Sequence, residues 1–239
     1  TEVNGLPNSG KYGTGIVFLP KDENEQKKCI SEIEKTVADE GFSIIAWRDI
    51  TVDVNALGPI AAEAEPTMQQ LFIKPNEDLD QLAIEKKLYV IRKVLESKIR
   101  TSSLEYKEMF YIASLSSKTV LYKGMLMPYQ VKEYFDDLRN EKMESAIALV
   151  HSRFSTNTFP AWDLAQPFRL LAHNGEINTV KGNRFWMQAR ESQFISSLFG
   201  DDIKKIAPVI EPNKSDSASF DNALEMLVLT GRSLPHAIM

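Results

Sequence analysis

The chain has 239 residues, of which 43% are hydrophobic and 26% are charged, and its formal net charge is −5. This composition excludes collagen, a coiled coil and a disordered chain, and it is typical of a globular protein with a sizeable core. The negative charge argues against nucleic acid or an anionic membrane surface as a partner, and no apolar run is long enough to span a bilayer.

The sequence contains one cysteine, Cys29, so no disulfide can form within the chain, which is compatible with a reducing compartment. Cys29 falls on the apolar face of a predicted helix, where a thiol is usually an inert small hydrophobe, and we do not expect it to be catalytic. Residue 1 is a threonine and no signal peptide follows it, so we interpret the chain as part of a longer protein.

The first hundred residues predict alternating strands and helices. In chain order we expect a strand at 14–19, a helix at 22–40, a strand at 42–47, a strand at 68–73 and a helix at 76–100. The last of these helices has the strongest support, because its apolar residues recur every three or four positions.

The remaining residues predict shorter elements. We expect a hairpin of strands at 110–114 and 119–123, a helix at 129–139, strands at 146–155 and 168–173, and helices at 176–192 and 218–230. Mixed strands and helices with hairpin-like local pairing favour an α+β fold over a parallel, doubly wound sheet.

Polar side chains concentrate between His151 and Asp221, around the ends of the two last predicted strands. They include Arg153, Thr156, Asn157, His173, Asn174, Glu176, Asn178, Lys181, Asn183, Arg184 and Asp216. Strand ends and turns are where functional sites tend to lie, although each residue taken singly also fits a helix cap or a solvated loop.

Several common active sites fit the sequence poorly. A serine hydrolase could use Ser152 with His151 or His173, but no G-x-S-x-G elbow is present. A zinc site at His173 and Glu176 would lack a second histidine at helical spacing, and Cys29 is remote, so we expect no metal. The glycines near the first strand precede it, and no P-loop occurs, so a dinucleotide or phosphate loop is not expected.

Five sequence blocks occur in a distinctive order: HSRFSTNTFP at 151–160, AQPFR at 165–169, HNGEIN at 173–178, GNR followed by WM within 182–187, and SDSASFD at 215–221. Together they resemble the glutamine amidotransferase domain in the large subunit of glutamate synthase. Residues 12–20 and 118–124 also fit that family. The similarity covers nearly the whole chain, and residues 1–239 are therefore interpreted as one such domain, incomplete at its N-terminus.

The resemblance implies the N-terminal-nucleophile hydrolase fold, an α+β four-layer α/β/β/α sandwich of two antiparallel sheets. It also implies that the nucleophile is the thiol of an N-terminal cysteine, whose α-amino group, titrating near ~8, serves as the base. Here residue 1 is Thr1 and the only cysteine is Cys29. An N-terminal threonine is a nucleophile in other members of the fold, but we favour a cysteine outside this chain, and we expect residues 1–239 alone to be inactive.

The resemblance assigns the site residue by residue. Arg153 would bind the α-carboxylate of glutamine through two hydrogen bonds, and Asp216 would hold the α-ammonium. The Asn174 amide and the Gly175 N–H would form the oxyanion hole. Further contacts to the substrate carboxylate are implied for Phe154, Thr156 and Asn157. Without the resemblance, a surface cation, a helix N-cap and a plain turn would explain Arg153, Asp216 and Asn174–Gly175.

The implied reaction is hydrolysis of L-glutamine through a cysteinyl thioester, with ammonia passing to 2-oxoglutarate in the synthase domains of the same polypeptide. No cofactor is expected in this chain, whereas FMN and an iron–sulfur cluster are expected in the rest of the protein. A small electron-transfer subunit or ferredoxin would be a further partner, and the location would be cytoplasmic, with a plastid left open. The rival hypothesis is a non-catalytic domain of the same fold that binds or senses an amino acid.

Overall fold

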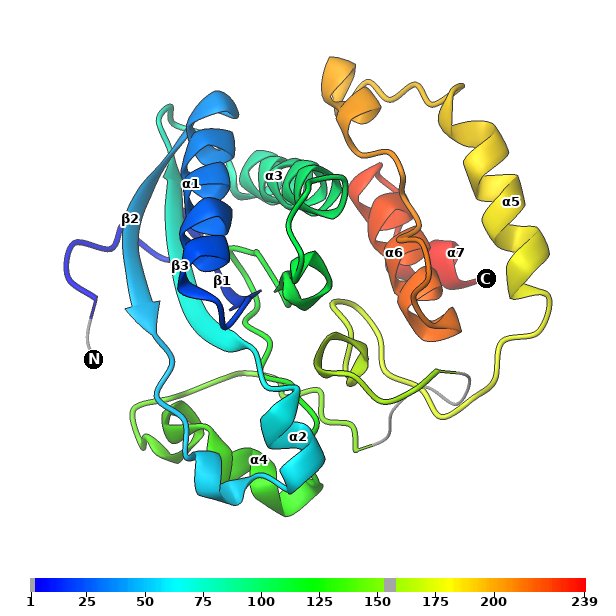
Figure 1. Cartoon of the computed structure of the whole chain (residues 1–239). Coiled ribbons are helices and arrows are strands. Elements are labelled where there is room, and N and C mark those ends of the chain that lie inside the picture. Colours follow the sequence, from blue (N-terminus) through cyan, green and yellow to red (C-terminus); the bar gives the residue numbers. More distant parts are fainter. Residues whose placement is uncertain (1–2, 153–157) are drawn as a thin grey trace. The chain divides into compact units, whose positions relative to one another are not determined.

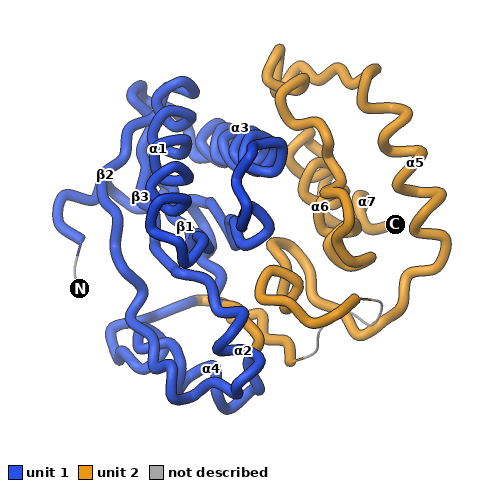
Figure 2. The backbone as a smooth tube through the Cα atoms, in the orientation of Figure 1, with its two compact units in different colours: residues 1–122, 126–145 blue, residues 123–125, 146–239 orange. Residues whose placement is uncertain are grey.

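The structure is a computed structural model that describes residues 3–152 and 158–239. The chain divides into two compact units, coloured separately in Figure 2. Unit 1 comprises residues 1–122 and 126–145, and unit 2 comprises residues 123–125 and 146–239. The assignment of 1–239 to one domain stays a prediction.

Unit 1 is built on a four-stranded antiparallel sheet with the strand order β2-β3-β1-β4. The strands are β1 (Gly13–Leu19), β2 (Phe42–Asp49), β3 (Thr67–Pro75) and β4 (Tyr111–Ile112). The pairing of β1 with β3 runs from Gly13 opposite Ile73 to Leu19 opposite Thr67. The strands predicted at 14–19, 42–47 and 68–73 are confirmed, with small shifts of their ends.

Helices α1 (Glu23–Asp39) and α3 (Gln81–Arg100) cover one face of this sheet (Figure 1). Asp22 and Asp80 cap them by accepting backbone N–H groups at 2.9 and 2.7 Å. Both predicted helices are therefore confirmed, and polar caps explain where they begin. The core between helices and sheet contains Val17, Leu19, Cys29, Ile33, Val37, Leu71, Ile73, Leu88, Ile91 and Leu95.

Cys29 is completely buried in this core. Burial, followed by the charge of Glu25, raises the pKa of its thiol to about 11. The predicted position of Cys29 on the buried face of a helix is confirmed. Because a thiol with a raised pKa forms little thiolate at neutral pH, its inertness stays the expectation.

The other face of the sheet carries a polar network. Alternation along the strands places Thr14 and Gln70 opposite the helix-covered face. Gln70 donates to the Thr14 hydroxyl at 3.0 Å and accepts from Arg48, which also binds Asp137. Tyr122 donates its hydroxyl to the same Asp137 carboxylate at 2.7 Å. These contacts tie three strands to Asp137, which lies in the segment after residue 134.

Two short helices, α2 (Pro59–Glu63) and α4 (Pro128–Tyr134), complete unit 1 and lie together in Figure 1. The helix predicted at 129–139 is thus split into α4 and a 3₁₀ turn. The described 3₁₀ helices of the chain are η1 (Val54–Ala56), η2 (Lys107–Met109), η3 (Asp136–Arg139), η4 (Trp162–Leu164) and η5 (Gly200–Lys205).

The hairpin predicted at 110–114 and 119–123 is wrong. Strand β4 pairs with β1, and residues 119–123 form no strand. The backbone of Ser116 exchanges two hydrogen bonds with Thr14, at 2.9 and 3.0 Å, so the chain after β4 continues along β1 and does not fold back on itself. Pairing with a distant strand satisfies the same backbone groups that the hairpin would have used.

Gly15 allows this close approach. A Cβ at position 15 would lie 1.5 Å from the Ser114 carbonyl oxygen, which is backbone and has little freedom to move. We expect Gly15→Ala to lower the free energy of unfolding of unit 1 by about 1–3 kcal/mol, measured by hydrogen exchange of the β1 and β3 amides. Gly58→Ala is the control, since its φ is −76° and its Cβ would meet none of the described residues within 4 Å. Equal effects of the two changes would contradict the prediction.

Unit 2 contains helices α5 (Val180–Glu191), α6 (Asp216–Leu229) and α7 (Leu234–Ile238). The helices predicted at 176–192 and 218–230 are confirmed with changed ends. None of the described residues of unit 2 lies in a named strand, so the strand at 168–173 is wrong, as is the described part, 146–152, of the strand at 146–155. Across the described residues, no helix is long and apolar enough to cross a membrane.

Candidate functional site

The segment that carries Asn174 and Gly175 is held by a glutamine side chain. Gln166 donates from Nε2 to the His173 carbonyl at 3.0 Å, and its Oε1 accepts the His173 N–H at 2.9 Å. Gln166 is itself buried. This pair of hydrogen bonds fixes the backbone immediately before Asn174, where residues 171–177 belong to no helix or strand.

Helix α6 contacts the same segment through Asp216. The Oδ2 atom of Asp216 accepts the N–H of Ile177 at 3.3 Å, and Oδ1 accepts the N–H and the hydroxyl of Ser217 at 2.6 and 3.1 Å. The structure therefore brings Asp216 close to the segment with Asn174 and Gly175. Helix α5 begins at Val180, later than the predicted position 176. The N–H of Ile177, before the helix, is bonded to Asp216.

Asp216 is not the N-cap of its helix, so that interpretation is wrong. Ser215 caps α6, because its hydroxyl accepts the Ala218 N–H at 3.1 Å, and Asp216 is the first helical residue. A carboxylate at this position is 6% exposed and lies at the positive end of the helix dipole. Since Ser215 already caps the helix, capping does not explain an acidic residue at 216.

A cavity of about 340 Å³ lies beside Asp216 in unit 2. Its lining combines apolar side chains of α5 and α6 with a few polar groups: Ile177, Val180, Asn183, Arg184, Met187, Ile210, Asp216, Ser219, Phe220 and Ala223. A larger hollow of about 760 Å³ also lies in unit 2, but none of the residues that the resemblance assigns to the site lines it. Because Asp216 lines the smaller cavity, that cavity is the better candidate for a binding site.

Arg184 of α5 ties that helix to the start of α6. Its Nε donates to the Ser219 hydroxyl at 2.9 Å, and its Nη2 donates to the carbonyls of Lys214 and Ser215 at 2.7 and 2.9 Å. The sequence marked Arg184 only as one polar residue among several. In the structure it shapes the wall of the cavity that contains Asp216.

Asn174 and Gly175 are exposed in the described chain. The Oδ1 atom of Asn174 lies 2.8 Å from Nε2 of His151. Among the residues that the structure describes, a Cβ at Gly175 would meet only His173 Nδ1, at 3.5 Å, which is an ordinary contact. Crowding among the described residues therefore does not require glycine at position 175. A ligand that approaches the backbone closely would require it.

Two buried ionisable side chains, Asp221 and Lys123, contact the turn at 168–171 or its neighbours, just before this segment. Asp221 of α6 is fully buried and accepts the Leu170 N–H at 2.8 Å, and burial raises its pKa to about 6. Lys123 donates to the Asp163 carbonyl at 2.6 Å and lies over the Phe168 ring at 4.7 Å. Burial lowers the pKa of Lys123 to about 7. The turn at 168–171 is thus held by α6 and not by a strand partner.

Sequence reasoning missed the roles of Gln166, Asp221 and His151. All three lie inside the sequence blocks that carry the family resemblance, which was the available signal. Their partners are 7, 51 and 23 positions away, and nothing in the local pattern identifies such contacts.

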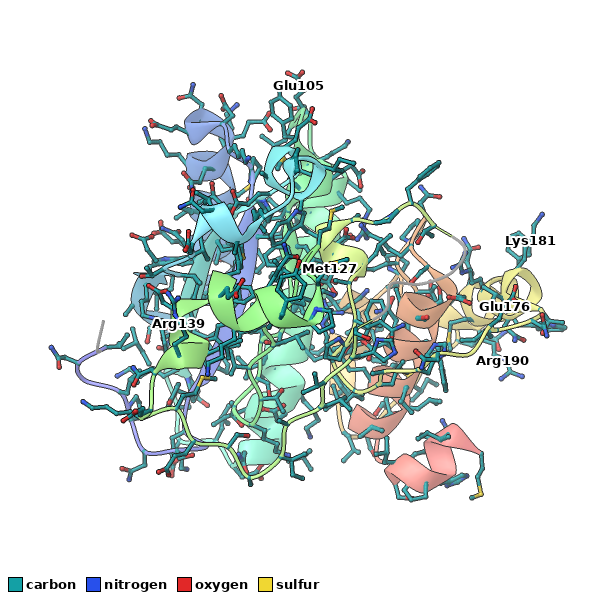
Figure 3. All side chains as sticks on the ribbon, turned by 90° about the horizontal axis from the view of Figure 1, so that it is seen from below. Glu105, Met127, Arg139, Glu176, Lys181 and Arg190 are labelled. Carbon is teal, nitrogen blue, oxygen red and sulfur yellow. The ribbon has the colours of Figure 1, made fainter. Side chains whose placement is uncertain are left out.

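Arg153, Phe154, Thr156 and Asn157 lie outside the described residues, as does Thr1. Figure 3 labels Glu176, Lys181 and Arg190 around helix α5, and all three are exposed. Within residues 3–152 and 158–239, no cluster of three His, Cys, Asp or Glu side chains could hold a metal ion.

Comparison with known proteins points to one family. The family described as "Glutamine amidotransferases class-II" matches residues 2–239. The chain is 48% identical over 235 residues to "Glutamate synthase [NADPH] large chain" of Bacillus subtilis (strain 168), covering 98% of this chain and 15% of that protein. It is 44% identical over 239 residues to "Glutamate synthase [NADH]" of Saccharomyces cerevisiae, covering 98% of this chain and 11% of that protein.

A plant protein shows the same similarity. The chain is 41% identical over 227 residues to "Ferredoxin-dependent glutamate synthase, chloroplastic" of Oryza sativa subsp. japonica, covering 95% of this chain and 14% of that protein. The chain therefore spans only about an eighth of the length of these curated relatives, between 11% and 15%.

Proposed function

Because the chain belongs to the class-II glutamine amidotransferases, we propose that it forms the glutamine-hydrolysing part of a glutamate synthase. One observation carries the proposal: Asp216, buried beside a cavity, is bonded to Ile177, two residues after Asn174–Gly175. In this proposal Asp216 would be the carboxylate that binds the substrate, and it contacts the segment that carries Asn174 and Gly175, which would be the oxyanion donors. Hydrolysis of an amino-acid amide uses a carboxylate to bind the α-ammonium group and N–H donors to stabilise the oxyanion.

The proposed substrate contacts recognise the α-ammonium and α-carboxylate groups of glutamine. Asp216 would bind the α-ammonium, and Arg153 would bind the α-carboxylate, with additional contacts from Phe154, Thr156 and Asn157. The Asp216 oxygens already accept from Ile177 and Ser217, which fixes their direction, and each oxygen can accept more than one hydrogen bond. The side-chain amide of the substrate is then directed to Asn174 and Gly175.

The proposed reaction proceeds through a thioester. A thiolate attacks the amide carbon of glutamine, the carbon–nitrogen bond breaks, and ammonia leaves after accepting a proton. Water then cleaves the thioester to release glutamate and restore the thiol. The Asn174 amide and the Gly175 N–H would donate hydrogen bonds to the oxyanion that forms in each step.

The proposed nucleophile is a cysteine outside residues 1–239, at the N-terminus of the mature protein. Two observations on Cys29 support this assignment: its side chain has no exposure in the core of unit 1, and its thiol pKa is raised to about 11. A nucleophilic thiol needs a lowered pKa and access to substrate, and Cys29 has neither. Residues 1–239 alone are therefore expected to release no ammonia from glutamine.

The proposal extends to the rest of the protein and to the complete fold. Ammonia would pass to 2-oxoglutarate in synthase domains that hold FMN and an iron–sulfur cluster. The electron donor is left open, because the relatives are named for NADPH, NADH and ferredoxin. The cytoplasm or a plastid would be the location. A four-layer α/β/β/α sandwich is proposed for the complete domain, supported by the helix-covered antiparallel sheet of unit 1.

The test uses the protein at its natural length. Asp216→Asn keeps the shape of the side chain and removes its charge, so we expect a fall of about 10- to 100-fold in kcat/KM for glutamine hydrolysis, from the loss of one charge-assisted hydrogen bond. Asp201→Asn is the control, because the Asp201 side chain is 94% exposed in the same unit. Ammonia release and glutamine affinity by calorimetry are measured for both variants.

The outcomes separate the proposal from its rival. Unchanged kcat/KM in Asp216→Asn would contradict the substrate-binding role. Glutamine binding by the natural-length protein that weakens in Asp216→Asn, without any release of ammonia, would instead favour the non-catalytic amino-acid-binding domain.

A further inference from the structure

The side chain of Asn174 has a histidine partner from a distant part of unit 2. Nε2 of His151 lies 2.8 Å from Oδ1 of Asn174, a length typical of a good hydrogen bond. His151 is half-buried, whereas Asn174 is exposed. The contact joins two of the sequence blocks, HSRFSTNTFP and HNGEIN.

The chemistry of this contact sets its direction. With the Asn174 amide in the orientation of the structure, its oxygen faces Nε2 of His151. An amide oxygen only accepts hydrogen bonds, so this contact corresponds to the tautomer in which Nε2 carries a proton and donates it. With the oxygen of the Asn174 amide turned to His151, the NH₂ group points the other way and keeps both N–H donors for another acceptor. A hydrogen bond to the amide oxygen also draws electron density from the nitrogen, which makes those N–H groups stronger donors.

We propose that His151 is a positioning residue for catalysis: it orients and polarises the Asn174 amide so that the NH₂ group donates to the reaction oxyanion. This inference rests on the proposed function, because it takes Asn174 as an oxyanion donor.

The backbone around Asn174 is held independently of His151. Gln166 binds both backbone polar groups of His173, and Asp216 accepts the N–H of Ile177. Loss of the His151 donor should therefore free the Asn174 side chain while the chain path and the Gly175 N–H stay in place. The expected kinetic signature is a lower kcat with an unchanged KM, because the amide acts on the oxyanion and not on ground-state glutamine.

The test compares two His151 variants whose side-chain amides differ in their distance from the backbone. The amide nitrogen of glutamine can occupy the position of histidine Nε2, whereas the shorter asparagine side chain ends near the position of Nδ1. In the natural-length protein, His151→Gln should retain most of the glutamine-hydrolysing kcat, and His151→Asn should lose about tenfold. Ammonia release gives kcat and KM, and thermal unfolding of each variant checks that it folds.

A second comparison uses the Asn174→Ala background. There the difference between His151→Gln and His151→Asn should vanish, because the group that His151 positions is gone. Equal activity of the two variants in the parent protein, or a difference that persists without Asn174, would overturn the inference. If Asn174→Ala keeps full activity, the failure belongs to the proposed function, and the two results are therefore distinguishable.

Discussion

Asp137→Ala is expected to lower the free energy of unfolding of unit 1 by about 3–5 kcal/mol. The substitution would leave the largely buried Arg48 guanidinium without its carboxylate partner. Arg48 binds Asp137 through two nitrogens, at 2.7 and 2.5 Å, and the two side chains are only 13% and 17% exposed. Tyr122 would lose the acceptor of its hydroxyl, which lies at 2.7 Å from Asp137. Hydrogen exchange of the β2 and β3 amides measures the effect.

Asp78 offers the matched control. Lys11 binds it at 2.7 Å, a distance like that of the Arg48 pair, but the two side chains are 48% and 91% exposed. Exposed pairs of this kind contribute only about 0–1 kcal/mol, so Asp78→Ala should change little. If both substitutions had the same small effect, burial would not govern the strength of the Arg48–Asp137 pair and the prediction would fail.

The same pair predicts a loss of stability in acid. The hydrogen bond from Arg48 is the main cause that lowers the pKa of Asp137 below the usual carboxyl value of about 3.9. A lowered folded pKa stabilises the folded state at pH values above the unfolded pKa. The contribution of Asp137 is therefore complete near neutral pH and is lost as the pH falls through its folded pKa, below about 4. Asp137→Asn should weaken this acid dependence in the exchange measurement.

Asn174→Ala is expected to reduce kcat for glutamine hydrolysis by about 10²–10³ with little change in KM, because it removes one donor to the oxyanion. Gln166 fixes the backbone at His173, so the substitution should leave the segment in place. Steady-state ammonia release by the natural-length protein measures the change.

Asn178→Ala serves as the comparison for this prediction. Asn178 is the same residue type, exposed and four positions further along the same segment. It should retain the parent kcat. A rise in KM without a fall in kcat for Asn174→Ala would show that Asn174 binds glutamine in the ground state, and the oxyanion role would have to be abandoned.

Regular elements were predictable where the pattern is local. Helices α1 and α3 follow from apolar residues at helical spacing and from the caps Asp22 and Asp80, all within a few positions of one another. The strands β1 and β3 follow from apolar runs that end at prolines or polar residues. Such signals do not depend on where the rest of the chain lies.

The errors occur where partners are remote. The apolar run at 168–173 resembles a strand, but Leu170 bonds to Asp221, and Phe168 donates to the Leu171 carbonyl at 2.9 Å. The hairpin after β4 failed for a similar reason, because Ser116 pairs with Thr14. A buried side chain of α6 satisfied the Leu170 N–H, and the backbone of a distant strand satisfied the polar groups of Ser116. The local pattern carries no information about either partner.

Taken by itself, the sequence determined the family of the chain, its α+β class, and a site hypothesis that names Asn174, Gly175 and Asp216. The tertiary structure alone decided that Ser215, and not Asp216, caps α6, that Asp216 contacts the segment after Gly175, and that His151 pairs with Asn174. Residue types and their order record which chemistry is available. Which donor meets which acceptor depends on the path of the chain over tens of residues, and only the folded structure specifies that path.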